Sequence, residues 1–225
     1  MKARWLTDKY ISLMLLVFPL WTGTEGYAAI TRGKFLFFAV LSALYRALLL
    51  PCALLDGEKP RRARLPQWSA LAFMAAACLS AALSPYGSAV ILGVSRYDGL
   101  LTLLLYGGTF LGASAFGEWK KYYVYLLAVS ASICSLVAIP QLLGGNPFGL
   151  YPGELTYFDA NVRYTGEFLG TIGNTNLLAA FYCLCIPLFV WHALTHRALR
   201  DRLVLAAAAL CLAVLIASRV ASGAV

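Results

Sequence analysis

Charged side chains are scarce in this sequence. Only 12% of its 225 residues are Asp, Glu, Lys or Arg, whereas 61% are hydrophobic. A water-soluble domain of this size needs more polar side chains than this to cover its surface. The composition therefore excludes an ordinary soluble domain and predicts that lipid is the main solvent of the chain.

Histidine and paired cysteine patterns are also lacking. The chain has two histidines, His192 and His196, and six cysteines that fall within apolar stretches: Cys52, Cys78, Cys134, Cys183, Cys185 and Cys211. No spacing among them is typical of a disulfide framework or a zinc site. The two histidines are four residues apart, as in helical metal sites, but the glutamate of the zincin motif is missing. We predict neither a metal nor a cofactor.

Nucleotide-binding motifs are missing too. The glycines Gly166, Gly170 and Gly173 in GEFLGTIGN fit neither the P-loop nor the dinucleotide pattern, and no lysine follows them. One interpretation is a flexible turn that feeds the next helix, which Asn174 or Thr175 would cap. The alternative is a helix N-terminus whose free N–H groups and positive dipole end receive an anionic ligand.

Long apolar runs dominate what is present. A spanning helix needs about 20 apolar residues, because the hydrocarbon core is ~30 Å thick and each residue rises ~1.5 Å. Seven runs qualify: 10 to 30, 35 to 55, 68 to 87, 99 to 117, 122 to 144, 177 to 197 and 203 to 225. The sequence thus predicts an all-α fold, a polytopic membrane helix bundle of about seven transmembrane helices in a single domain over 1 to 225.

The basic residues indicate the orientation. With the N-terminus in the cytoplasm, the inner segments hold Lys2, Arg4, Lys9, Lys59, Arg61, Arg62, Arg64, Lys120, Lys121, Arg197, Arg200 and Arg202, and the outer ones hold Arg32, Lys34, Arg96 and Arg163. This asymmetry follows the positive-inside rule. The net charge of +8 is therefore explained by the membrane orientation, and we predict no nucleic-acid partner. A cleaved signal peptide is an alternative for the first run, but uncleaved first helices are the rule when more spans follow.

Two connecting segments on the outer side are unusual. Residues 88 to 98 are too apolar for a free loop and too few to span, which favours an interfacial or re-entrant piece. Residues 145 to 176 form the longest polar segment, and long loops in compact proteins tend to be functional or disordered. Its aromatic residues favour an ordered outer loop that lies on the membrane surface.

Arginines near or inside the spans are the candidate ligand contacts. Arg46 lies deep in the second run, where a charge costs a few kcal/mol, so it is a functional candidate unless it pairs with a polar neighbour. Arg219 lies near the outer end of the last run, where a contact with headgroups is cheap. Arg96 and Asp98 flank Tyr97, and adjacent opposite charges at an interface are commonly anchors; Arg96 is also a candidate ligand contact.

Three stretches resemble the O-antigen ligase and polymerase superfamily of bacterial envelope proteins. They are SRYDGLLTLLLY at 95 to 106, RYTGEFLGTIGNTNLLAAFYCLCIPL at 163 to 188, and IASRVASG at 216 to 223. GTIGNTNLLAA is the most specific part and is similar to the family's GTFGNPN, with Thr175 in place of the usual proline. Arg219 matches the arginine of the family's SRG motif, although Val220 stands where the glycine is usual.

The resemblance implies an enzyme of the bacterial inner or plasma membrane. Such an enzyme takes a glycan from undecaprenyl diphosphate on the outer side and joins it to a glycan, lipid or protein acceptor, without nucleotide or metal. It implies that arginines hold the diphosphate and that the general base is a histidine in a later loop, so the catalytic residues here are unknown and the chain is expected to be an N-terminal portion. The substrate-binding candidates are Arg219, Arg46, Arg163, Gly173, Asn174, Asn176 and Arg96.

Two other functions are compatible with these residues. In a transporter or channel, Arg46 and the 88 to 98 segment would line the path. In a non-catalytic fragment or membrane subunit, the motifs would have no catalytic partner.

Overall fold

The computed structural model describes residues 2–94, 96–153, 158–159, 162–163, 168–196 and 198–220, with only the backbone given for 158–159 and 162–163. Nearly all regular structure in these ranges is helical. The α-helices are α1 (Lys2–Leu16), α2 (Ile30–Leu55), α3 (Leu65–Ala82), α4 (Ala89–Leu92), α5 (Leu100–Phe116), α6 (Tyr122–Leu142), α7 (Thr175–Thr195) and α8 (Leu199–Ser218). The short elements are the 3-10 helices η1 (Phe18–Leu20) and η2 (Gly26–Ala29) and the strands β1 (Phe158–Asp159), β2 (Val162–Arg163), β3 (Phe168–Leu169) and β4 (Gly173–Asn174).

The chain forms two compact units. Unit 1 comprises Met1–Ser12 and Phe35–Trp119, and unit 2 comprises Leu13–Lys34 and Lys120–Val225. The limits fall within α1 and α2, so each of these helices contributes to both units.

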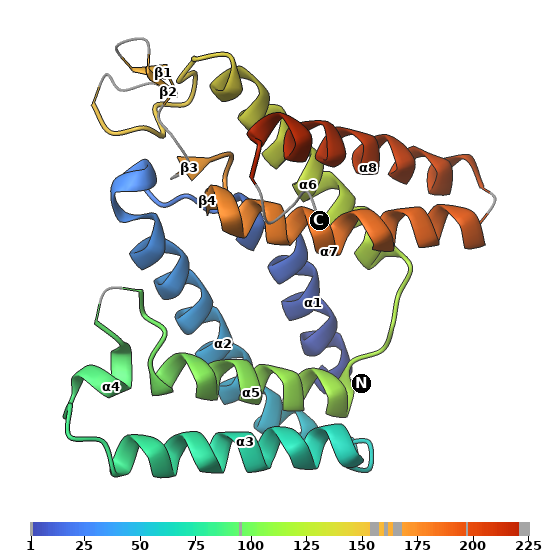
Figure 1. The fold of residues 1–225 in the computed structure, drawn as a ribbon. Coiled ribbons are helices and arrows are strands. Elements are labelled where there is room, and N and C mark those ends of the chain that lie inside the picture. Colours follow the sequence, from blue (N-terminus) through green and yellow to red (C-terminus); the bar gives the residue numbers. More distant parts are fainter. Residues whose placement is uncertain are drawn as a thin grey trace. The chain divides into compact units, whose positions relative to one another are not determined.

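Unit 1 combines an apolar helix pair with a polar contact between α1 and α2. Helix α3 packs along α5, and the short α4 also contacts α5 (Figure 1). The rings of Tyr10 and Tyr45 stack with centroids 4.2 Å apart. The hydroxyl of Tyr10 lies 2.8 Å from Ser42 Oγ, and that of Tyr45 lies 2.9 Å from Thr7 Oγ1. These paired hydroxyls satisfy one another inside an apolar helix contact, where an unpaired hydroxyl would be costly.

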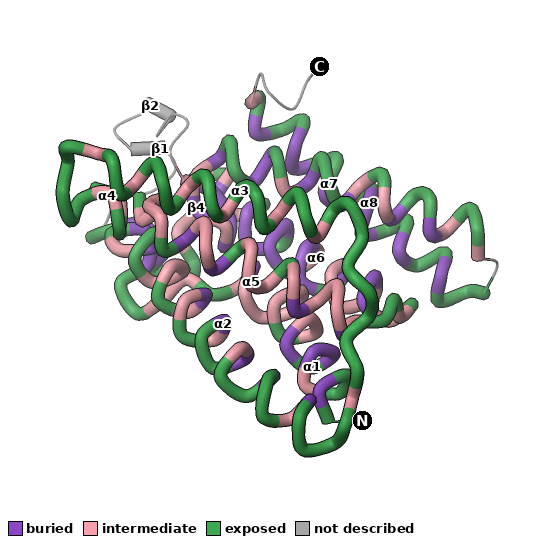
Figure 2. The backbone as a smooth tube through the Cα atoms, turned by 90° about the horizontal axis from the view of Figure 1, so that it is seen from below, coloured by how far each residue is buried: buried purple, intermediate pink, exposed green. Residues whose placement is uncertain are grey.

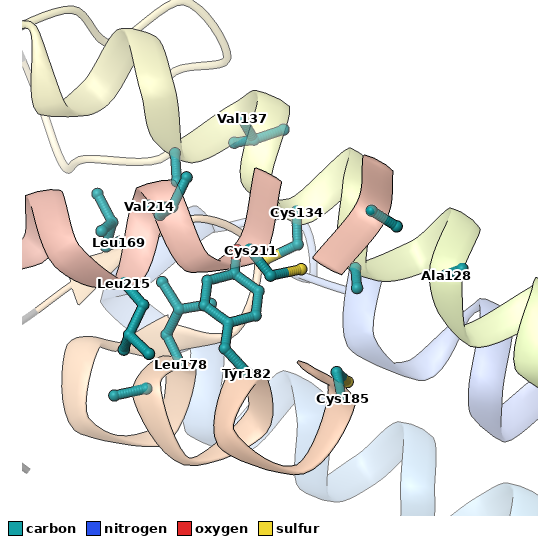
Figure 3. Packing of buried hydrophobic residues seen from close by; sticks show 14 of the residues in the cluster. Ala128, Cys134, Val137, Leu169, Leu178, Tyr182, Cys185, Cys211, Val214 and Leu215 are labelled. Atoms are coloured by element: carbon teal, nitrogen blue, oxygen red, sulfur yellow. The ribbon is translucent and has the colours of Figure 1, made fainter. Parts of the chain in front are cut away.

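Unit 2 is built around α6, α7 and α8. Helices α7 and α8 are antiparallel neighbours joined by a short turn, and both pack on α6 (Figure 1). Figure 3 shows Leu178 and Tyr182 of α7 beside Leu215 and Cys211 of α8, with Cys134 of α6 against the same cluster. Small buried residues such as Ala131 and Cys134 allow this close approach, as in other membrane bundles.

Among the residues that the structure describes, five helical segments are long and apolar enough to cross a membrane. They are Gly26–Leu55, which joins η2 and α2, Leu65–Ala82, Tyr122–Leu142, Thr175–Thr195 and Leu199–Ser218, and the shorter Leu100–Phe116 is also apolar. Helix α3 has no buried residue and is free of purple along its length in Figure 2, as expected for a helix that faces lipid. The predicted helical membrane bundle is confirmed, but the predicted count of about seven spans is not, and in the described part of the chain two pairs of two-residue strands depart from an all-α fold.

The predicted first span at 10 to 30 is wrong. Helix α1 ends at Leu16, and η1 with Pro19 in its first turn follows. Proline lacks the N–H that a continuing helix requires, and Gly23 then adopts a left-handed φ of 76°. The apolar run is therefore interrupted. The 15-residue α1 ends within it at Leu16, and the chain is not α-helical between that point and the start of η2 at Gly26.

Candidate functional site

The start of α7 is fixed by Asn174. Its side-chain oxygen accepts the backbone N–H groups of Asn176 at 2.9 Å and Leu177 at 3.4 Å. The prediction that Asn174 or Thr175 caps this helix is confirmed for Asn174. The cap occupies two of the N–H groups at the start of α7. An anion at this point would therefore meet the positive end of the helix dipole and not these N–H groups.

Two glycines shape the β3–β4 hairpin that leads into α7. Gly170 has a φ of 61°, and a Cβ there would lie 2.9 Å from Cys134 Sγ. Gly173 has a φ of 96°, and a Cβ there would lie 2.8 Å from Ile30 Cδ1. Any other residue would combine backbone strain with a steric clash. The hairpin therefore depends on glycine at both positions.

A closed set of hydrogen bonds holds this hairpin in place. The amide of Gln141 accepts the N–H of Gly170 at 2.7 Å and donates to the hydroxyl of Tyr27 at 2.9 Å. That hydroxyl in turn donates to the carbonyl oxygen of Gly170 at 2.6 Å. Tyr151 adds a hydrogen bond of 2.8 Å from its hydroxyl to the carbonyl of Phe168. Gln141 and Tyr27 position the hairpin, and the sequence analysis did not predict either of them, although a lone glutamine in an apolar run is a usable signal.

Arg219 ends α8 in an unusual conformation. Its φ of 53° and ψ of 31° are left-handed, and its N–H donates to the carbonyl of Ile216 at 3.1 Å. Such a conformation is typical of glycine or asparagine after a helix, so an arginine here is strained. The side chain is exposed, and among the described residues no hydrogen bond or ion pair engages its guanidinium. Val220 returns to the apolar core of unit 2 and anchors the backbone on the far side of Arg219.

The antiparallel packing of α7 and α8 brings several candidates to one end of unit 2. We call this the hairpin end, defined as β3, β4, the first turn of α7 and the last turn of α8. Gly173, Asn174, Asn176 and Arg219 share it, since α7 begins where α8 ends (Figure 1). Ile30 touches Gly173, so the beginning of α2 lies here as well.

Cations outnumber anions among the described side chains of the hairpin end and the start of α2. Arg219 and Arg32 are exposed, and Glu25 is the exposed carboxylate that precedes η2. The ammonium of Lys34 is turned back on η1, where it donates to the carbonyls of Phe18 at 3.2 Å and Pro19 at 3.3 Å. Arg219 and Arg32 are thus available to an anionic ligand, whereas Lys34 has a structural partner.

The remaining arginine candidates are not brought to this end by the described structure. Arg46, half-buried in α2 of unit 1, donates from Nε to the carbonyl of Ser42 at 3.1 Å and from Nη1 to that of Leu104 at 3.2 Å. Arg96 is an exposed residue of unit 1. Arg163 belongs to β2, whose backbone pairs with β1, and its side chain lies outside the described residues.

Gly108 makes room for Arg46. A Cβ at Gly108 would lie 2.5 Å from Arg46 Nη1, so the guanidinium packs directly against α5. Within the described part of the chain, no carboxylate lies within ion-pair distance of Arg46. The alternative interpretation, that Arg46 pairs with polar neighbours, is supported by these carbonyl contacts.

A second polar cluster lies at the opposite end of the α7–α8 pair. Nε2 of His192 lies 3.1 Å from Asp201 Oδ1, and the hydroxyl of Tyr125 donates to the same oxygen. The His192 and His196 rings stack with centroids 4.5 Å apart. Among the described residues no group of three or more His, Cys, Asp or Glu side chains is placed to hold a metal ion. The cluster therefore joins three helices through one carboxylate.

Comparison of the chain with protein-family models, with curated proteins and with solved structures found no match. Function is therefore inferred from the side chains at the hairpin end and from the motif residues that lie there.

Proposed function

We propose that this protein transfers a glycan from an undecaprenyl-diphosphate carrier to an acceptor on the outer side of a bacterial inner or plasma membrane. The observation that carries the proposal is the position of Arg219. It leaves α8 with an exposed guanidinium, which no described residue engages, at the end of unit 2 where the GTIGNTN turn begins α7. The two motifs that resemble the ligase and polymerase superfamily are far apart in sequence and meet at one place in the fold.

The chemistry of this transfer needs a cation at a membrane boundary. An acceptor hydroxyl attacks the anomeric carbon of the glycan, the bond from that carbon to the phosphate oxygen breaks, and the hydroxyl proton passes to a base. The departing diphosphate gains negative charge as the bond breaks, and a guanidinium at a low-dielectric boundary stabilises that charge better than in water. The planar fork of Arg219 can bind two phosphate oxygens together.

The hairpin contributes to the proposed site by fixing the position of α7 and not by a charged side chain. Asn174 and Gly173 fix where α7 starts, and the positive end of its dipole then faces the same region as Arg219. Asn176 is exposed in the first turn of α7 and can donate from its side-chain amide to a glycan or phosphate oxygen. Arg96 and Arg163 are proposed as further contacts to the carrier, and Arg46 as a support for unit 1.

The proposed topology has seven crossings and a cytoplasmic N-terminus. Helix α1 with η1 and the 17-residue α5 would add two crossings to the five long segments. In a protein freed of its native cysteines, Pro60→Cys and Arg200→Cys should react with an impermeant thiol reagent only from the cytoplasm. Phe148→Cys, at a side chain 64% exposed, should react only from outside; residue 155, within the same predicted loop, lies outside the described residues. Labelling of position 200 from outside would contradict the orientation.

The transfer itself is tested with a purified lipid-linked glycan donor and the complete protein in liposomes, without nucleotide or metal. Arg219→Ala should lower the transfer rate by about 100-fold, as expected when a transition-state donor is removed. Arg219→Lys keeps the charge and loses the fork, so a loss of about tenfold is expected. Arg46→Lys should be milder, because single contacts to carbonyls need a donor and not a fork. Transfer by Arg219→Ala at the wild-type rate would refute the proposed role.

A further inference from the structure

Unit 1 contains a cavity of about 440 Å³ between α3, α4 and α5. This is within the range of ~300 to 1,000 Å³ that is usual for small-molecule sites. Its wall is largely apolar and includes Ala77 and Ala81 of α3, Val90 of α4 and Leu103 of α5. Asp98 is the charged residue in the wall.

The loop between α4 and α5 sets the position of Asp98. Gly93 and Gly99 pack so closely that a Cβ on Gly99 would lie 2.5 Å from the backbone nitrogen of Gly93. A Cβ on Gly93 would lie 2.7 Å from Asp98 Oδ1. Neither glycine can carry a side chain without a shift of the backbone, so this close approach of Gly93 to Gly99 and Asp98, which places the carboxylate beside the cavity, requires glycine at both positions.

The carboxylate of Asp98 has no counter-charge in the described part of the chain. Asp98 is exposed, so it lies at the rim of the cavity, and no described cation is within ion-pair distance. Helix α3, which forms one wall, exposes Phe73 and Leu79, at 57% and 62%, and buries none of its residues. An apolar cavity beside a lipid-facing helix, with a single anion at its rim, matches an amphiphile that has an apolar tail and a cationic head.

We propose that this cavity holds the acyl chain of an aminophospholipid whose ammonium group pairs with Asp98. Arg96, two residues earlier and exposed, offers a guanidinium to the phosphate of the same headgroup. The negative charge of Asp98 disfavours a lipid whose head carries only negative charge, such as a polyprenyl diphosphate. The site is therefore separate from the donor site proposed above and does not depend on it.

Native mass spectrometry of the purified protein tests the proposal. The protein is equilibrated in mixed micelles with equal amounts of phosphatidylethanolamine and phosphatidylglycerol of identical acyl chains, and the retained lipids are counted. The wild type should retain phosphatidylethanolamine in preference to phosphatidylglycerol by about fivefold, the range of one exposed ion pair. Asp98→Asn should abolish this preference, and Ala81→Phe, which fills the cavity, should reduce retention of both lipids.

Glu25→Gln is the matched control, because it removes one exposed carboxylate from unit 2 and should retain lipids as the wild type does. Equal retention of the two lipids by the wild type, or an unchanged preference in Asp98→Asn, would overturn the proposal and leave ordinary annular lipid only. Asp98 is exposed and unpaired among the described residues, so its substitution tests the site even if Ala81→Phe fails to fold.

Discussion

Substitution of Gly173 by alanine is expected to disrupt the hairpin end for two separable reasons. The first is backbone strain, since φ is 96°, a value that costs a residue with a Cβ about 1–2 kcal/mol. The second is the contact of the new methyl group with Ile30 Cδ1, 2.8 Å away; because this atom is the free end of a side chain, it can move aside, and the cost is about 1 kcal/mol, the low end of the range for overpacking. Together they predict a loss of about 2–3 kcal/mol in the free energy of unfolding.

A second substitution separates the two causes. Ile30→Val removes Cδ1 and leaves Cγ2, at 3.4 Å, as the nearest atom to the added methyl group. Alone it should cost about 0.5–1.5 kcal/mol. In the double variant the clash is relieved and only the backbone strain remains, so a favourable coupling of about 1 kcal/mol is expected.

Gly149→Ala is the control for backbone strain alone. Gly149 has a φ of 59°, and nothing lies within 4 Å of a Cβ built there. It should cost about 1–2 kcal/mol and show no coupling to Ile30→Val. The assay is unfolding of the purified protein by SDS in mixed micelles, followed by helical circular dichroism. A Gly173→Ala variant as stable as Gly149→Ala, or a cycle without coupling, would refute the described contact between the hairpin and α2.

Two further predictions concern the carboxylates of Asp56 and Asp201, which accept hydrogen bonds from other helices. The backbone N–H of Lys2 donates to the Asp56 carboxylate at 2.9 Å and, as the main cause, holds the pKa of Asp56 below its ordinary value. The resulting stabilisation is present above the unfolded pKa of about 4 and is lost as the pH falls through the lower folded pKa. Asp56→Asn should therefore lower the unfolding temperature at pH 7 more than at pH 3. Equal shifts of the unfolding temperature at both pH values would contradict this. At the other end of α7 and α8, Asp201→Asn should destabilise less than Asp201→Leu, because an amide oxygen still accepts from Tyr125 and His192; equal losses in thermal unfolding would show that the shared carboxylate oxygen is not what joins these helices.

Local sequence patterns predicted the helices well and their interruptions poorly. An apolar run such as the one that became α6 is predicted to be helical because every backbone N–H and C=O group in lipid must be hydrogen-bonded within the protein. The run at 10 to 30 had the same composition, but Pro19 and the left-handed Gly23 ended the helix within it. A hydropathy average over a window of residues does not register single residues that end a helix.

The candidate site was predictable where it depended on neighbours in sequence. The Asn174 cap acts on N–H groups two and three residues away, so its pattern is readable from the chain itself. Cys183 and Cys185 are two residues apart in α7, a spacing that directs side chains to different sides of a helix, and Cys183 is exposed while Cys185 is buried.

Contacts between distant segments left no such pattern. The hydroxyl of Tyr27 meets the carbonyl of Gly170, 143 residues away, and nothing local marks either as a partner. Arg46 donates to backbone carbonyls, which every residue carries, so its partner had no sequence signature. The carboxylate shared by Tyr125 and His192 was also missed, although an acid in the first turn of an apolar helix is a recognisable signal.

The most direct measurement is glycan transfer by Arg219→Gly compared with Arg202→Ala. Glycine is the residue that a left-handed φ of 53° favours, so Arg219→Gly preserves or improves the end of α8 while it removes the guanidinium. Arg202 is an exposed arginine in the first turn of the same helix, at the opposite end. We predict that Arg219→Gly unfolds at or above the wild-type temperature and has lost transfer from the lipid-linked donor, while Arg202→Ala transfers at the wild-type rate. Transfer by Arg219→Gly equal to that of Arg202→Ala would contradict the proposal that the hairpin end binds the diphosphate.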